Sequence, residues 1–530
     1  MARKGSYKQA REGGSGLFWL GLLGFVVFFL AMQALRSVEP FGMDQGLFGC
    51  FGKWVPQGAL PYRDIWDSKP PLILYTYPLA FVLTGGGVGG MWFFEGVWLA
   101  LTCAVAFGLG RKLWGRAAGL AAAFFVFTGL WSAGLEGYTS RSQSEELLAL
   151  PLLGAAWALI GARQRDRSAL LSGVLLGIAG LYKVPAMVVA AAWPLALWPA
   201  VGAGRALRRT ALAAFGALVP WLLAAAWFAG HGAFGDFIDA VFIYNRHYAE
   251  IVGGGASLLS VGSEFLRRVG LSLPTAILAA GVGTALIVFR REKQSFWLVG
   301  WLSLASVAVL AQKQIAGYHC LLLVPPLALL AARAVAALAV PGERRLRPLR
   351  LALLLALVVA AVAEGNVWLR VYGRDAAVAS GRITRERFLA SFRVGPFSPL
   401  VERQAARFLR KHCPVGRRIL VWGLSPGIYV LADRRPATRF PFHHLLLTDS
   451  PLSKAWGNLA ARRRAFVEDL RRDPPAFILV GTEDRNGFEP EDSRTQMIRF
   501  PEFRNFVREH YEQQERIANF LVYRELQRPR

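Results

Sequence analysis

Long apolar stretches alternate with short polar ones from residue 17 to residue 370, and the pattern then changes. A helix needs about 20 mostly apolar residues to cross a membrane. Eleven stretches approach that length and predict spanning helices at 17–35, 91–110, 117–135, 147–162, 168–182, 184–201, 211–230, 271–289, 295–311, 320–340 and 351–370. The pattern therefore predicts an α-helical polytopic membrane protein with about 11 transmembrane helices.

Five basic clusters separate these stretches and predict the orientation of the chain. If the N-terminus is cytoplasmic, each cluster follows an even number of crossings and stays inside, as the positive-inside rule requires. The clusters are Arg111/Lys112/Arg116, Arg163/Arg165/Arg167, Arg205/Arg208/Arg209, Arg290/Arg291/Lys293 and Arg344/Arg345/Arg347/Arg350. Eleven crossings then leave the C-terminal part on the opposite, extracytoplasmic side.

The stretch 70–84 (PPLILYTYPLAFVLT) is apolar, but it is short and contains three prolines. Counting it as a span would move Arg111 and every later basic cluster to the outside. A stretch of this length is more often a re-entrant or interfacial segment. We therefore predict a re-entrant or interfacial helix at 70–84.

Residues 371–530 have the composition of a polar domain, which places the predicted boundary of the transmembrane domain at 370. Runs that resemble strands and helices alternate there, which predicts a small α/β domain. The strand-like runs are 418–422, 477–480 and 520–523, and the helix-like runs are 426–432 and 503–516. No Walker loop and no G-x-G-x-x-G motif follows a strand, so nucleotide binding is not supported.

Composition agrees with a membrane location. Of 530 residues, 54% are hydrophobic and 18% are charged, whereas soluble domains have about 25% charged residues. The net charge of +26 could suggest nucleic acid, but much of the basic excess lies in short loops between apolar stretches, so we predict no nucleic-acid partner. The four cysteines do not have the spacing of metal ligands.

Three segments on the predicted outer side are long or acidic: 36–69, 136–146 and 231–270. Long loops are usually functional or disordered, and the aromatic residues here argue against disorder. We therefore expect the working face on the outer side, with 36–69 as a long first extracytoplasmic loop.

Asp44 follows the first span by a few residues and should lie near the membrane surface. A carboxylate walled by aromatic rings and lipid there could accept a proton from an acceptor hydroxyl, as a general base does. Alternatively, Asp44 is a helix cap or a solvated loop acid.

Lys69, which stands just before Pro70-Pro71, could hold a phosphate as a point charge, or it could be an interfacial lysine that extends to water. Glu145 and Glu146 begin the fourth span on the outer side. They could face Asp44 as a second acid or metal ligand, although acids are favoured at a helix N-terminus in any case.

Other polar and aromatic residues fall on the same predicted face. Tyr244 and Asn245 would suit sugar hydroxyls, or equally an interfacial aromatic belt. Cations and polar residues that could serve a lipid phosphate are Arg246, Lys313, His319, Lys183 and Tyr318. Together these residues predict one outward-facing cavity with acids for an acceptor and cations for a phosphate.

The order of these features resembles the GT-C fold glycosyltransferases that use polyprenyl-phosphate sugars, which include the protein O-mannosyltransferases (glycosyltransferase family 39) and the aminoarabinose transferase of lipid A. The stretches that carry the resemblance are Met43-Asp44-Gln45-Gly46, Pro61-Tyr62-Arg63-Asp64-Ile65-Trp66-Asp67-Ser68-Lys69-Pro70-Pro71, Tyr244-Asn245, Tyr318-His319 and Val421-Trp422-Gly423 with Pro426 and Tyr429. The second of these is the most specific.

The resemblance implies inverting transfer of a sugar from a polyprenyl-phosphate carrier to an acceptor hydroxyl of an envelope glycan, lipid or protein, on the outer face of a bacterial inner membrane. Asp44 would be the base. The phosphate would be bound by Lys69, Lys313, His319 and Arg246, and the acceptor or sugar by Tyr62, Asp64, Asp67, Glu145, Tyr244 and Asn245.

Relatives commonly have an Asp-Glu pair where this chain has Asp44-Gln45, so the second acid is missing. No cofactor is therefore certain, and a divalent cation (Mg²⁺ or Mn²⁺) stays an open alternative. The rival function is a transporter or flippase of lipid-linked envelope precursors. Transporters commonly contain internal repeats and ionisable residues within their spans, and the sequence offers little of either.

Overall fold

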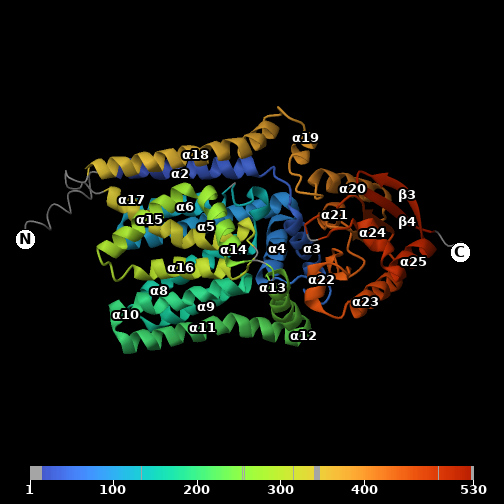
Figure 1. Cartoon of the computed structure of the whole chain (residues 1–530), viewed down its shortest axis with the longest axis horizontal. Coiled ribbons are helices and arrows are strands. Elements are labelled where there is room, and N and C mark those ends of the chain that lie inside the picture. The colour runs from blue at the N-terminus through green and yellow to red at the C-terminus, as the bar shows by residue number, and fades with distance from the viewer. Residues whose placement is uncertain are drawn as a thin grey trace, which may run out of the picture.

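The computed structural model describes residues 15–526, apart from positions 133, 254, 256, 314, 340–346 and 488. Figure 1 shows long helices side by side in one half of the molecule and the orange and red C-terminal elements in the other. Helices α3, α4 and α13 lie between the two halves.

The first half is helical throughout. Its elements are α2 (Ser15–Arg36), α3 (Met43–Trp54), η1 (Val55–Gln57), α4 (Pro71–Thr84), α5 (Gly87–Trp114), α6 (Arg116–Leu130), η2 (Gly137–Ser140), α7 (Ser144–Leu147), α8 (Ala149–Gly161), α9 (Asp166–Tyr182), η3 (Val184–Ala192), α10 (Trp193–Val201), α11 (Ala203–Gly230), α12 (Phe234–Ile238), η4 (Asp239–Tyr244), α13 (Asn245–Gly253), α14 (Leu258–Ser272), α15 (Pro274–Phe289), α16 (Phe296–Leu310), η5 (Gly317–Leu323), α17 (Val324–Leu338) and α18 (Arg347–Ala379).

Each of the eleven predicted spans overlaps helical segments, although the predicted span 117–135 extends beyond the end of α6 at Leu130. Residue 340, and the predicted basic residues Arg344 and Arg345, lie outside the described residues. Among the described residues, seven helical segments are long and apolar enough to cross a membrane, or eight if the bent pair α14–α15 is one span. Three further apolar helices, α4, α6 and α16, are shorter. The polytopic helical class is therefore confirmed, whereas the number of crossings stays a prediction.

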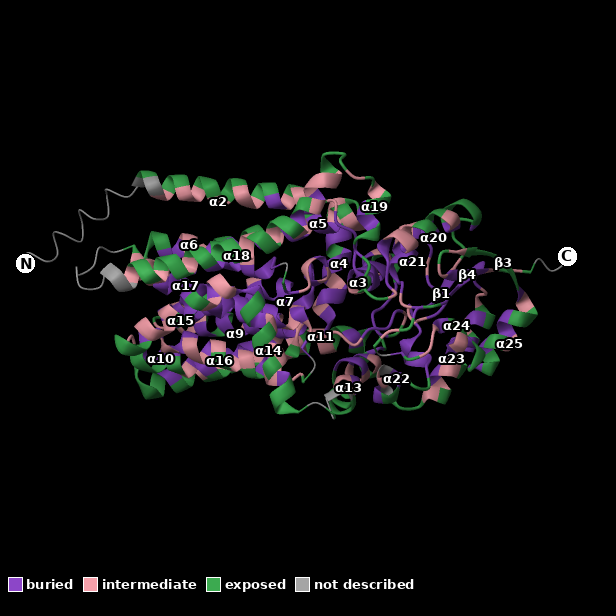
Figure 2. Ribbon diagram, turned by 45° about the horizontal axis from the view of Figure 1, so that its top comes forward, coloured by how far each residue is buried: buried purple, intermediate pink, exposed green. Residues whose placement is uncertain are grey.

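The outer surface of the bundle is apolar, as contact with lipid requires. Only 6% of the residues in the most apolar stretch of α2 are buried, and the same share in α18. Figure 2 shows exposed residues along both helices. Leu20 and Leu351 are each 67% exposed. Because such side chains are unfavourable in water, these faces suit a hydrocarbon environment.

Segments predicted as outer loops contain helices of their own. Asp44 lies in the first turn of α3, and the short apolar stretch forms the 14-residue helix α4, with Pro71 near its start and Pro78 inside it. Helix α14, within the third outer segment, meets α15 at 102°. The segments predicted as outer loops are therefore largely folded into helices.

The C-terminal half is a small α/β domain. Its elements are α19 (Arg385–Ala390), α20 (Pro399–His412), β1 (Ile419–Trp422), α21 (Gly427–Ala432), η7 (His444–Leu446), α22 (Pro451–Trp456), α23 (Leu459–Arg472), β2 (Phe477–Gly481), α24 (Ser493–Ile498), α25 (Pro501–His510), β3 (Tyr511–Ile517) and β4 (Phe520–Glu525). The sheet order is β1-β2-β4-β3, with β1 parallel to β2 and the other pairs antiparallel.

Two sequence-based boundaries differ from the structure. The helix predicted at 503–516 ends at His510, and residues 511–517 form strand β3 because they pair with β4. Helix α18 continues to Ala379, through the proposed domain boundary at 370.

The C-terminal domain packs directly on α3. A Cβ atom at Gly46 would lie 2.7 Å from the backbone nitrogen of Gly427 in α21. Because only glycine at position 46 permits this approach, the backbone of the C-terminal domain touches the helix that carries Asp44. The position of that helix therefore depends on both halves.

Candidate active site

Asp44 is held by groups from two other segments. Gln143 Nε2 donates a hydrogen bond of 3.0 Å to Asp44 Oδ2, and Lys69 Nζ lies 3.8 Å from the same oxygen. About a quarter of each charged side chain is exposed, 24% for Asp44 and 26% for Lys69. A carboxylate in the first turn of a helix is also favoured by the helix dipole. Asp44 is thus oriented but still reachable.

Lys69 carries a positive charge next to Asp44. Burial acts to lower the pKa of Lys69, but the nearby carboxylates of Asp44 and Asp67 outweigh it, so the pKa lies above its ordinary value. The ammonium also lies 5.2 Å from the centre of the Phe48 ring, within cation–π range. Lys69 is therefore a charged group at neutral pH.

The loop that presents Lys69 is held by its own side chains. The Tyr62 hydroxyl donates a hydrogen bond of 2.9 Å to the carbonyl of Lys69. Asp64 Oδ2 accepts the backbone N–H of Leu60 at 2.8 Å, and Asp67 Oδ1 accepts that of Lys69 at 3.2 Å. Burial raises the pKa of Asp67. These residues shape the loop around Lys69.

Tyr244 and Asn245 support the same loop from the outer side. Asn245 Nδ2 donates 2.7 Å to the carbonyl of Ser68, and the rings of Tyr244 and Trp66 meet edge to face at 4.9 Å. Both residues had been expected to meet a sugar or acceptor. In the structure they hold the backbone next to Lys69.

Glu145 forms a second charged group. It is buried in α7 and paired with Lys183, and His319 Nε2 lies 4.0 Å from its Oε1. Lys183 Nζ lies 5.7 Å from the centre of the Tyr318 ring. The second acid suggested by the sequence thus has a cation and a histidine beside it.

Two of the expected phosphate ligands lie apart from this arrangement. Arg246 is exposed and approaches Glu250 at 3.4 Å. Lys313 is exposed, with a backbone φ of 57°. Within the described part of the chain, neither forms an ion pair with Asp44 or Glu145.

The hydrogen bonds of Gln45 explain why this chain has an amide, and not a second acid, next to Asp44. Its amide Nε2 donates to the carbonyls of Arg141 at 2.7 Å, Thr139 at 2.9 Å and Tyr138 at 3.3 Å. A carboxylate cannot donate hydrogen bonds and would repel these oxygens. Position 45 therefore anchors α3 to the segment that carries Gln143.

Sequence reasoning missed the buried ion network behind Asp44. The Arg141 guanidinium bonds Glu39 at 2.7 Å and Glu95 at 3.0 Å, and Arg36 bonds Glu39 at 3.1 Å. Glu95 lies within the predicted span 91–110. An acid inside an otherwise apolar span is the sequence feature that could have indicated this network. Paired buried charges of this kind fix geometry more reliably than they add stability.

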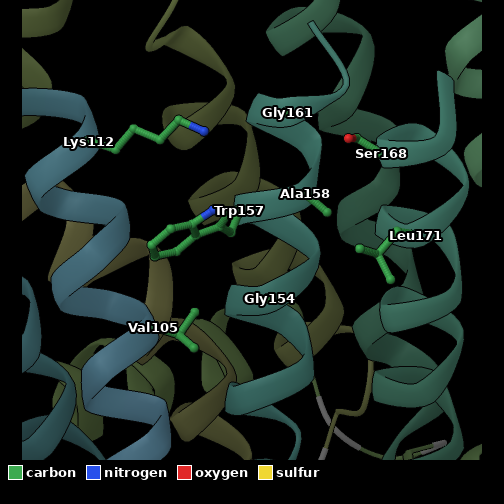
Figure 3. Close-up of a pocket in the computed structure, with 8 residues that line it drawn as sticks. All are labelled: Val105, Lys112, Gly154, Trp157, Ala158, Gly161, Ser168 and Leu171. Carbon is green, nitrogen blue, oxygen red and sulfur yellow. The ribbon is translucent and has the colours of Figure 1, made fainter. Parts of the chain in front are cut away.

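A groove of about 430 Å³ between α5, α8 and α9 lies elsewhere (Figure 3). Lys112 and Trp157 line it, with Nζ 6.0 Å from the ring centre. Along α5, Lys112 is roughly 25 Å from Glu95 at 1.5 Å per residue. Since Glu95 belongs to the network behind Asp44, the groove opens at the far end of the bundle.

The fold and this site define a class: a polytopic helical membrane protein with a charged site where its outer helices meet a small α/β domain. No protein-family model matches the sequence, and no curated protein matches it. Solved structures do. ArnT from Cupriavidus metallidurans bound to undecaprenyl phosphate has a TM-score of 0.57 and 14% identity, over 94% of this chain and 98% of that chain.

Two further structures agree. ArnT from the same organism in the apo state has a TM-score of 0.53 and 14% identity, over 95% of this chain and 98% of that one. The third is the Archaeoglobus fulgidus oligosaccharyltransferase tethered with an acceptor peptide containing the NVT sequon. It has a TM-score of 0.50 and 11% identity, over 94% of this chain and 74% of that one. The GT-C-like fold predicted from the sequence is confirmed.

Proposed function

We propose that this protein is an inverting membrane glycosyltransferase that moves a sugar from a polyprenyl-phosphate carrier to an acceptor hydroxyl on the outer face of the membrane. The observation that carries the proposal is the pair formed by Asp44 and Lys69, an acid and a cation 3.8 Å apart at the domain junction. The similar ArnT structure contains undecaprenyl phosphate, which supports a lipid-phosphate donor here.

Lys69 and Asp44 divide the chemistry between them. The lipid tail keeps the donor phosphate at the headgroup plane, where Lys69 binds it. This draws the ammonium away from Asp44 and frees the carboxylate as a base. The acceptor oxygen then bonds to the anomeric carbon while the carbon–oxygen bond to the phosphate breaks. The acceptor proton passes to Asp44, and Lys69 stabilises the departing phosphate.

The other residues fall into two groups under this proposal. Tyr62, Asp64 and Asn245 position the loop, and Asp67 and Tyr244 line it. Lys183 and His319, around Glu145, complete the positive surroundings of the phosphate, whereas Lys313 and Arg246 attract the donor from the exposed rim. The acceptor class is an envelope glycan, lipid or protein.

The residues around Asp44 do not fit a divalent cation. Mg²⁺ and Mn²⁺ need several oxygen ligands, but Lys69 neighbours Asp44 and Lys183 neighbours Glu145. The Gln45 amide nitrogen is committed to backbone carbonyls, so position 45 does not supply the second carboxylate that a divalent cation beside Asp44 would prefer. We therefore propose transfer in which lysines, and not a metal, balance the charge.

The alternative of a transporter or flippase is not favoured. Helix α3, which carries Asp44, lies at the end of the bundle beside the C-terminal domain (Figure 1), whereas transporters place substrate sites near the midplane. Membranes incubated with a panel of polyprenyl-phosphate sugars separate the two, since only a transferase consumes a donor.

The Asp44→Asn variant tests the base directly. We expect donor consumption to fall by about 10²–10⁴-fold, because a general base contributes that much, while expression and membrane insertion stay unchanged. Glu468→Gln, at an exposed acid in α23, is the matched control and should keep full activity. Full activity in Asp44→Asn would remove the proposed role.

A further inference from the structure

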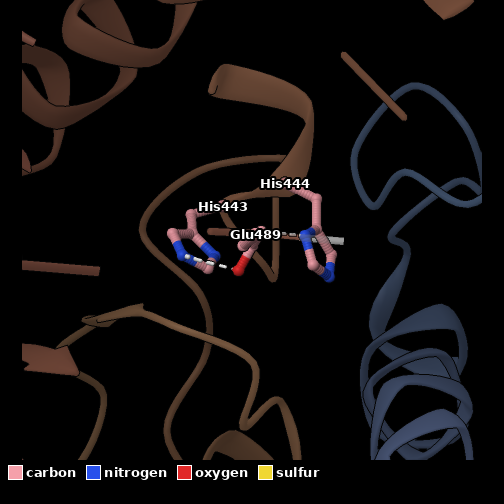
Figure 4. Close-up of side chains that lie close together, drawn as sticks. All are labelled: His443, His444 and Glu489. Atoms are coloured by element: carbon pink, nitrogen blue, oxygen red, sulfur yellow. Dashed lines mark ion pairs between the residues drawn. The ribbon is translucent and has the colours of Figure 1, made fainter. Parts of the chain in front are cut away.

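His443, His444 and Glu489 gather inside the C-terminal domain (Figure 4). They are 1%, 6% and 2% exposed. One ligand atom from each lies within 4.8 Å of the other two. The histidines are adjacent at the start of η7, and Glu489 comes from the loop between β2 and α24, so the fold brings distant parts of the chain together.

The three side chains converge on one point. His444 Nδ1 is in direct contact with a Glu489 oxygen, and His443 Nε2 lies 3.7 Å from the other. In a tetrahedral zinc site the ligand atoms are about 3.3 Å apart, since metal–ligand bonds are about 2.0–2.1 Å. Small side-chain rotations therefore suffice to place an ion between them.

Neighbouring polar groups hold these side chains from outside. Asn486 Nδ2 donates a hydrogen bond of 3.0 Å to Glu489 Oε2. Ser493 Oγ lies 2.8 Å from His443 Nε2 and donates 2.6 Å to Asp484 Oδ2. The hydrogen bond from Asn486 orients the carboxylate, as outer partners commonly orient metal ligands. Because Ser493 donates to Asp484, it accepts from His443 Nε2, and His443 would exchange this contact for the ion.

A buried ion pair alone does not use all the ligand atoms of this cluster. One protonated histidine balances Glu489, and the second imidazole stays neutral with a lone pair to offer. A divalent cation can take a lone pair from each imidazole and from the carboxylate.

We propose that His443, His444 and Glu489 bind a divalent transition-metal ion of the zinc class. Two imidazoles and one carboxylate are a recognised zinc ligand set, with a fourth position left for water. This site is separate from the proposed sugar transfer and does not depend on it.

The position of the ion gives it a structural role. Arg439, in the same segment as the histidines, donates from Nε to the carbonyl of Arg63 at 2.8 Å, and its own carbonyl accepts the N–H of Trp66 at 2.9 Å. The ion would fix the segment that supports the loop before Lys69. It would thereby join the C-terminal domain to the active-site loop.

Metal analysis of the full-length protein, purified without a histidine tag and equilibrated with zinc, tests the site. We expect close to one zinc ion per chain. The double variant His443→Gln/His444→Gln, and separately Glu489→Gln, should lose it. His412→Gln, at an exposed histidine of α20, is the matched control and should keep it.

Chelation provides a second readout. A chelator should lower the unfolding temperature of the natural protein and of His412→Gln, but not that of Glu489→Gln. If the variants fail to fold, the natural protein can be loaded with Co²⁺ in place of zinc. Tetrahedral nitrogen and oxygen ligands give bound Co²⁺ an intense visible absorption spectrum, which would report the site. The proposal would be overturned if neither bound zinc nor that spectrum were found. It would also be overturned if zinc were lost in Glu145→Gln but kept in the variants of His443, His444 and Glu489, because the metal would then lie beside Asp44.

Discussion

At the scale of single residues, each of the two acids of the candidate site has a cation beside it. Asp44 neighbours Lys69 at 3.8 Å, and Glu145 neighbours Lys183. A free carboxylate and a free lysine close together attract one another, so each is fully available only when a ligand takes its partner. Donor binding and base activation are therefore linked in the proposed reaction.

The Lys69→Ala variant should weaken donor binding more than acceptor binding. A charged hydrogen bond contributes about 1.5–3 kcal/mol, so we expect the KM for the donor to rise about ten- to hundred-fold. Steady-state kinetics at varied donor and at varied acceptor measure both. Lys454→Ala, at an exposed lysine of the C-terminal domain, is the control. An unchanged donor KM would contradict the role of Lys69.

The Gln45→Glu variant restores the acidic pair typical of the resembling enzymes. We expect lower activity and a free energy of unfolding reduced by about 1–3 kcal/mol, because three carbonyls lose their donor. Added Mg²⁺ or Mn²⁺ should not restore activity. Gln57→Glu, at an exposed amide in η1, should behave like the natural protein. Activity stimulated by Mn²⁺ in Gln45→Glu would contradict the proposed absence of a catalytic metal.

At the scale of elements, α3 is fixed from two sides. Gln45 joins it to η2, and Gly46 lets it approach Gly427 of α21. The N–H of Gly427 also donates 3.1 Å to Glu402 Oε1 in α20. Glu402 is buried against this junction, so its charge affects how firmly the C-terminal domain is packed.

The pH dependence of stability tests this junction. Burial raises the pKa of Glu402 to about 8 from 4.5, despite the hydrogen bond from Gly427. The folded state thus holds a proton that the unfolded state loses, and stability should fall between about pH 4.5 and pH 8.

Glu402→Gln should remove that part of the pH dependence and unfold at a nearly constant temperature across the same range. Unfolding followed by tryptophan fluorescence in detergent measures it. Glu386→Gln, at an exposed acid of α19, should keep the natural slope. Equal slopes in both variants would show that Glu402 does not titrate as described.

At the scale of the whole molecule, two halves of different polarity meet over Asp44. The bundle exposes apolar helices along α2 and α18 (Figure 2), and the C-terminal domain has a mixed sheet with its own core. A donor with a lipid tail approaches from the bundle side, and a polar acceptor approaches from the aqueous side. The junction is where both could meet.

The predicted orientation places that junction outside the cytoplasm. A reporter active only in the extracytoplasmic compartment, fused after Arg530, should be active. The same reporter fused after Arg165, in a predicted cytoplasmic loop, should be silent. The opposite pattern would place Asp44 in the cytoplasm and remove the lipid-linked donor from its reach.

The sequence by itself determined the helices, because long apolar runs admit few other structures in lipid. It also singled out Asp44, Lys69 and Glu145 as candidate site residues, because they fall in or next to the predicted outer loops, and their roles stay predictions. Residues 511–516 were misassigned as helix because strand β3 depends on pairing with β4, and local propensity does not contain that information.

Only the tertiary structure decided which polar groups meet. Gln143 reaches Asp44, and Gln45 reaches carbonyls nearly a hundred positions along the chain. The cluster of His443, His444 and Glu489 likewise forms only after folding. Side-chain chemistry is local, but a hydrogen bond or a metal site needs distance and direction, and these are set by how whole helices and domains pack.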